Sequence, residues 1–199
     1  MRVLLAAIRC EKGDIAGNLA SHLAIVDQAA SAGCDLAEGR PHITQVLAGG
    51  GQVLGVQRKR HLGEGEESFE PAREHAALSW AGVRFGAAIC AEAGYDAPFD
   101  AAAASGARLV LFPAAPGLHG RRTSESAWQA GFAWWEECAL GDASRHARRL
   151  GLWIALAGQA GSTADEDFPG LAALVRPDGG IAARLPDWRA GLLTVDIPV

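Results

Sequence analysis

The stretch VRFGAAICAE, residues 83–92, contains a mostly apolar run that ends at Cys90. The run has the length of a buried strand, and residues 91–96 after it predict a turn into a helix. Backbone N–H groups and the positive pole of a helix at such a strand end can stabilise a thiolate and a developing oxyanion. Cys90 is therefore a candidate nucleophile, although most free cysteines are small buried apolar residues.

A second candidate lies upstream in GVQRKRHL, residues 55–62. Lys59 follows a predicted strand there and precedes an acidic loop that contains glycines. A lysine ammonium can stabilise an oxyanion beside a thiol. Taken alone, a lysine between Arg58 and Arg60 is typical of solvated surface charge. The local pattern thus leaves the role of Lys59 open.

Working outward from these two segments, the chain alternates between predicted hairpins and helices. The glycines at 49–51 and the turn at 81–82 each indicate a hairpin, and Ser124 is the expected N-cap of a long helix that Gly141 could break and Gly151 ends. The expected strands are 3–8, 42–48, 52–57, 78–90 (as a pair), 108–112, 152–157, 171–175, 181–185 and 192–197, and the other helices are 19–30 and 97–105. This order predicts sheets with helices packed outside them in layers.

Composition narrows the functional classes. The 199 residues carry a net charge of −5, which does not favour nucleic acid or an acidic membrane surface. The four cysteines lack zinc or disulfide spacing, and no histidine spacing indicates a metal site. No apolar run approaches the roughly 20 residues of a membrane helix. We expect one cytoplasmic domain over residues 1–199, without cofactor or metal.

Together, the lysine and cysteine segments resemble motifs of the nitrilase superfamily of carbon–nitrogen hydrolases. Residues 55–62 resemble its lysine motif, and residues 86–92 resemble its cysteine motif. Supporting features occur in the same order as in the family: Asn18 before the two motifs, and residues 106–115 and 168–179 after them. The resemblance implies an α/β fold, a four-layer α-β-β-α sandwich of two mostly antiparallel sheets. It also implies a homo-oligomer, at least a dimer, with the aromatic helix 124–140 as the candidate subunit face.

The resemblance assigns roles to the two candidates. Cys90 would attack an amide or nitrile carbon, Lys59 would stabilise the tetrahedral intermediate, and water would cleave the thioester. Ala91 and Ala115 occupy the matching oxyanion or pocket positions. The implied partner is a small amide or nitrile, and amides are favoured because most relatives cut amides.

Glutamates are the least settled part of the predicted site. Many family members carry a supporting glutamate after the lysine, and either Glu66 or Glu67 matches it; the alternative is solvated loop charge. Glu92 could line the pocket, or could be a first-turn helix carboxylate.

The expected catalytic glutamate is missing from the pattern. Relatives carry it at the end of the second strand, within a Phe-Pro-Glu segment, and no such segment occurs in this sequence. The second strand starts at residues 34–36, yet residues 42–62 already match a later part of the family pattern. We therefore expect an internal deletion near residues 36–42 that removes a strand-helix-strand segment. Glu38 comes too early to replace the missing residue.

Three function hypotheses follow. The first is a hydrolase of carbon–nitrogen bonds other than peptide bonds (amide, carbamoyl or nitrile) that works through a cysteine thioester. The second is a catalytically impaired scaffold that acts as a binding or structural protein. The third is a shortened version of a longer enzyme, in which the lost strand would expose sheet edges that must be covered.

Overall fold

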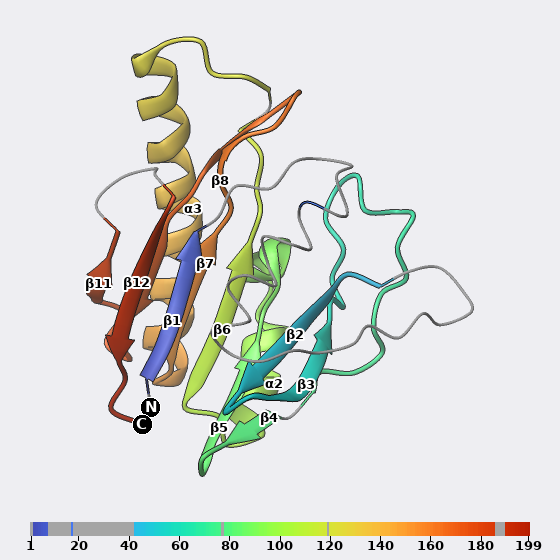
Figure 1. The fold of residues 1–199 in the computed structure, drawn as a ribbon. Helices are drawn as coiled ribbons and strands as arrows, with labels where there is room; N and C mark the ends of the chain where they lie inside the picture. Colours follow the sequence, from blue (N-terminus) through green and yellow to red (C-terminus); the bar gives the residue numbers. More distant parts are fainter. Residues whose placement is uncertain (1, 8–16, 18–41, 77, 119, 186–189) are drawn as a thin grey trace.

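A computed structural model describes residues 2–7, 17, 42–76, 78–118, 120–185 and 190–199 of the chain (Figure 1). The predicted helix after Asn18, the strand start at 34–36, Glu38 and His119 lie outside the described residues. The other predicted strands and helices are present, most with ends shifted by one or two residues.

A six-stranded sheet forms the middle of the molecule. Its strands are β4 (Leu78–Trp80), β5 (Val83–Ala87), β6 (Leu109–Ala114), β7 (Trp153–Gly158), β10 (Ala172–Val175) and β11 (Ile181–Arg184), in the order β11-β10-β7-β6-β5-β4. The outer pairings are antiparallel, but β5, β6 and β7 run parallel. The centre is parallel because helical crossovers link these three strands, and a parallel pair needs such a crossover.

Strand β6 runs two residues beyond its predicted end, through Pro113 to Ala114. The carbonyl of Leu111 faces β5 and accepts from the N–H of Ala88. The backbone of Pro113, two residues further on, also faces the β5 side, but it lies past Leu111, which pairs with Ala87, the last β5 residue in register. Its missing N–H therefore deprives no neighbouring strand of a hydrogen bond.

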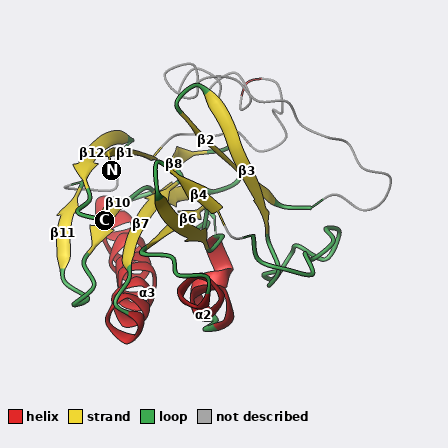
Figure 2. Cartoon of the chain, turned by 90° about the horizontal axis from the view of Figure 1, so that it is seen from below, coloured by secondary structure: helices red, strands yellow, loops and turns green. Residues whose placement is uncertain are grey.

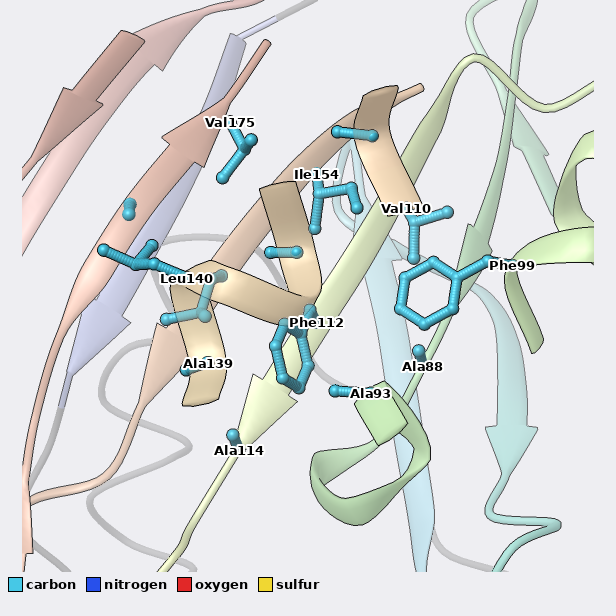
Figure 3. Close-up of a cluster of buried hydrophobic side chains, with 14 of the residues drawn as sticks. Ala88, Ala93, Phe99, Val110, Phe112, Ala114, Ala139, Leu140, Ile154 and Val175 are labelled. Carbon is cyan, nitrogen blue, oxygen red and sulfur yellow. The ribbon is translucent and has the colours of Figure 1, made fainter. Parts of the chain in front are cut away.

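Helices α2 (Ala97–Ala104) and α3 (Glu125–Leu150) cover one face of this sheet (Figure 2). Ser124 caps α3 by accepting from the N–H of Ala127 at 3.2 Å, and Gly151 ends it at a φ of 67°. Gly141 does not break the helix, because buried residues recur on one face before and after it. The core they join includes Phe132, Trp135, Ala139, Leu140, Ala143 and Ala147. Figure 3 shows part of this core, with Ala139 and Leu140 labelled.

Strands on the opposite face form a second β layer. β1 (Arg2–Ala7) pairs antiparallel with β12 (Gly191–Asp196), and β2 (Thr44–Gly49) pairs antiparallel with β3 (Gln52–Arg58). A second core fills the space between these strands and the sheet, with Leu47, Phe85, Leu109, Leu174 and Val195 among its members. The described residues thus form three layers: helices, the six-stranded sheet and this second β layer (Figure 2).

A short hairpin, β8 (Ala160–Ser162) with β9 (Asp167–Pro169), completes the described strands. Of the aromatic residues on α3, Phe132 and Trp135 pack inward, whereas Trp134 is exposed. No described helix combines the length and apolar character needed to cross a bilayer.

Candidate active site

Lys59 is buried, contrary to the surface position that its two arginine neighbours favour. It follows the last residue of β3, and its backbone bonds to Ile43 and Ala72 on either side. Its side chain has no exposed surface. Nζ donates to both carboxylate oxygens of Glu66, at 2.6 and 2.7 Å. A buried ammonium needs such a partner, because desolvation otherwise disfavours its charge.

Glu66, one of the two alternatives in the sequence, holds the lysine. Besides Lys59, its carboxylate accepts from the N–H of Gly63 at 2.5 Å, which fixes the loop between them. Glu67 lies on the exposed side of the same loop and accepts from the N–H of Gly65. Hydrogen bonds from the backbone N–H groups of Glu67 itself and of Gly65 lower the pKa of the Glu67 carboxyl.

Cys90 begins a five-residue 3₁₀ turn, η1 (Cys90–Gly94), which is separated from the end of β5 by Ala88 and Ile89. The predicted helix after the thiol is therefore this short turn, with α2 starting at Ala97. Cys90 is partly buried and has a φ of +50°. A non-glycine residue in this left-handed region carries strain, and such residues cluster at functional sites.

Glu92 ties the lysine segment to the cysteine turn. Its side chain is fully buried. One oxygen accepts from the N–H groups of Arg60 (2.8 Å) and His61 (3.2 Å), and the other accepts from the N–H of Ile89 (2.8 Å). Arg60 directly follows Lys59, and Ile89 directly precedes Cys90. The backbone nitrogens of Arg60 and Ile89 each lie 2.8 Å from an oxygen of the same carboxylate, so these two nitrogens are at most roughly 8 Å apart.

The predicted pocket positions lie at the same end of the sheet. Ala91 follows Cys90, and a Cβ added to Gly63 would lie 3.2 Å from the Cβ of Ala91. The loop that carries Glu66 therefore packs against the cysteine turn. Ala115 is exposed and follows β6, whose carboxyl end neighbours that of the parallel strand β5.

His61 and His75 are residues that the sequence reading did not connect with the site. Together with Glu92 they form a group whose possible ligand atoms all lie within 4.8 Å of one another. The ring of His61 also stacks on Tyr95 at 4.5 Å. Because both Glu92 oxygens already accept backbone hydrogen bonds, we assign no metal to this group. Their separation along the chain gave no signal of this proximity.

Burial lowers the pKa of His75, although the Glu92 charge acts in the opposite direction. A nearby open cavity of about 630 Å³ includes His75 in its lining, along with His42, Arg58 and residues 70–76. Lys59 and Cys90 are not among the lining residues, so the cavity adjoins the candidate site rather than containing it.

The carbon-nitrogen hydrolase family profile matches residues 37–199. This chain belongs to the carbon–nitrogen hydrolase family. The match spans most of the chain and includes both the lysine and the cysteine segments. No curated protein sequence matches the chain significantly.

Solved structures of an amidase from Nesterenkonia sp. AN1 share the fold. One is a glutamate-to-glutamine mutant after Michael addition of acrylamide at its active-site cysteine; it has a TM-score of 0.61 and 29% identity over 74% of this chain and 53% of that one. Another, a glutamate-to-leucine mutant with the acetamide moiety of fluoroacetamide on that cysteine, has a TM-score of 0.62 and 28% identity over 78% and 55%. The chain spans about half the length of these amidases, which is consistent with the predicted loss of a segment.

Proposed function

We propose that this carbon–nitrogen hydrolase acts on small amides, with Cys90 as the nucleophile and Lys59 as the stabiliser of the tetrahedral intermediate. One observation carries the proposal: a fully buried lysine, paired with Glu66, is tied through Glu92 to the strained turn of a cysteine. Burying an ammonium is costly, so a buried lysine whose segment is bonded to a cysteine turn favours catalysis over packing.

The proposed reaction has two halves. The Cys90 thiolate attacks the amide carbon, the carbon–nitrogen bond breaks, and the nitrogen leaves as ammonia or an amine after taking up a proton. Water then attacks the thioester, which releases a carboxylic acid and restores the thiol. In both halves the Lys59 ammonium stabilises negative charge on the substrate oxygen.

Without the Phe-Pro-Glu segment, proton transfer should be the weak step. General acid–base catalysis contributes about 10²–10⁴-fold in typical enzymes. In the two Nesterenkonia amidase mutants described above a glutamate is replaced, and the active-site cysteine still carries a covalent adduct. Adduct formation on Cys90 is therefore the most direct test of the proposal, since it does not require complete turnover.

The test exposes the protein to fluoroacetamide and to acrylamide and locates the adduct by peptide mass spectrometry. Cys138 serves as the internal control, because burial raises the pKa of its thiol and makes it less reactive. We expect Cys90 to be modified at least tenfold faster than Cys138, and Cys90→Ala to remove that fast adduct. Equal modification rates for the two thiols would contradict the proposal.

A second candidate function follows from the same missing segment. A protein that forms the fluoroacetamide and acrylamide adducts on Cys90 but releases no ammonia from small amides would be a catalytically impaired member, acting as a binding or structural protein. Measuring ammonia release beside adduct formation separates the two functions.

We also propose that α3, with Trp134 exposed, is the subunit face of a homo-oligomer. Light scattering of the wild-type protein and of Trp134→Glu tests this proposal.

A further inference from the structure

We infer that Glu92 is a positioning residue, whose carboxylate sets the Lys59 ammonium and the Cys90 thiol relative to each other. The inference rests on the proposed function, which uses these two groups together. Glu92 itself need touch no substrate: it is completely buried, and both of its oxygens are bonded to backbone N–H groups.

The arrangement of the three donors is the first argument. Arg60 and His61 belong to the segment after β3, whereas Ile89 belongs to the turn after β5, which is about thirty residues further along the chain. These segments leave different sheets, so the pairing of strands does not fix the distance between them. The carboxylate bonds directly to both segments, at the residue next to each catalytic candidate.

Backbone strain at Cys90 is the second argument. Its φ of +50° is unfavourable for a residue with a side chain and persists only where neighbouring contacts hold it. The Glu92 carboxylate accepts from the N–H of Ile89, the residue before Cys90. The Glu92 N–H in turn donates to the Ile89 carbonyl at 3.1 Å. These two bonds close the turn around the cysteine.

Glu92→Gln changes this arrangement with little change in shape. A carboxylate offers acceptors on both oxygens, but a glutamine amide turns one of them into a donor. In either orientation the amide NH₂ faces a backbone N–H, so the lysine segment or the cysteine turn loses its bond. Glu92→Asp keeps the charge but is one methylene shorter, so it cannot reach both segments at once.

The experiment follows the rate of iodoacetamide reaction with Cys90 from about pH 6 to pH 10, which spans ordinary thiol ionisation. For Glu92→Gln and Glu92→Asp we expect at least a tenfold lower rate at pH 7.5 and a profile midpoint at higher pH. The physical reason is that the Lys59 ammonium no longer stabilises the thiolate. His61 and His75, which face the carboxylate, are retained in every variant.

The direction of the shift separates positioning from a plain charge effect. If Glu92 acted only through its negative charge, Glu92→Gln would move the midpoint to lower pH, since a nearby anion disfavours a thiolate. Asp167→Asn is the matched control, because Asp167 is also a buried carboxylate that accepts from a backbone N–H, that of Arg122. It should leave the Cys90 profile unchanged.

A measurement on the wild-type protein guards against variants that fail to fold. The amides of Arg60, His61 and Ile89 should exchange slowly with solvent deuterium, as hydrogen-bonded groups do. Fast exchange of all three, or a wild-type labelling profile in Glu92→Gln, would overturn the inference. If instead the shift occurs but wild-type protein hydrolyses no amide, the proposed function fails and the positioning role stands.

Discussion

Removing the negative charge of Glu66 should destabilise the whole protein, although Glu66 lies in a loop. Its carboxylate oxygens lie 2.6 and 2.7 Å from the Lys59 Nζ, and the lysine side chain has no exposed surface. Glu66→Gln would leave a buried ammonium beside a neutral amide. That unpaired charge must then be hydrated, neutralised or exposed by local unfolding.

The size of the effect follows from burial. Breaking a buried ion pair by removing one partner costs about 3–5 kcal/mol. The Glu66 side chain is 24% exposed, so water can reach part of the site, and we expect a loss near the lower end, about 3 kcal/mol. For a domain of this length that loss corresponds to a melting temperature about 6–12 °C lower.

Calorimetry and urea denaturation measure this loss against Glu67→Gln, a matched change in the same loop. Glu67 is exposed, and its variant should melt close to the wild-type temperature. A double variant, Lys59→Met with Glu66→Gln, removes the unpaired charge and should be more stable than Glu66→Gln alone. A Glu66→Gln protein melting within about 2 °C of wild type would refute the reasoning.

Two further predictions concern the packing around the cysteine turn. In Gly86→Ala the new Cβ would lie 2.5 Å from the Cβ of Ala102, so α2 must move away from β5; urea denaturation should show a loss of about 1–3 kcal/mol, and unchanged stability would mean that this contact does not set the helix position. His146 stacks on Phe99 and bonds to the Ala93 carbonyl, and burial lowers its pKa below the ordinary 6.5. The folded state then binds fewer protons than the unfolded state, so stability is complete above pH 6.5 and falls as the pH drops below it. The melting temperature should therefore fall more between pH 7.5 and pH 5.5 in wild type than in His146→Gln; equal falls would contradict the assignment.

Local features of the fold were determined by the sequence itself. The hairpin turns at glycines 50–51 and at residues 81–82, the cap at Ser124 and the helix end at Gly151 all lie where the residues predict them. Each depends on the backbone angles and hydrogen bonds of a few neighbouring residues, which a local sequence specifies. The two motif residues, Lys59 and Cys90, were likewise available from short segments that resemble a family.

Tertiary structure decided what surrounds those two residues. The choice between Glu66 and Glu67 as partner of Lys59 depends on the conformation of the loop that carries both. Burial of Lys59 and the bonds from Glu92 to the lysine segment depend on segments that meet only after the sheets pack. The parallel centre of the sheet has the same origin, because it follows from where the crossover helices dock. Contacts between residues about thirty positions apart depend on the free energy of packing and desolvation of the whole fold. No local sequence pattern encodes them.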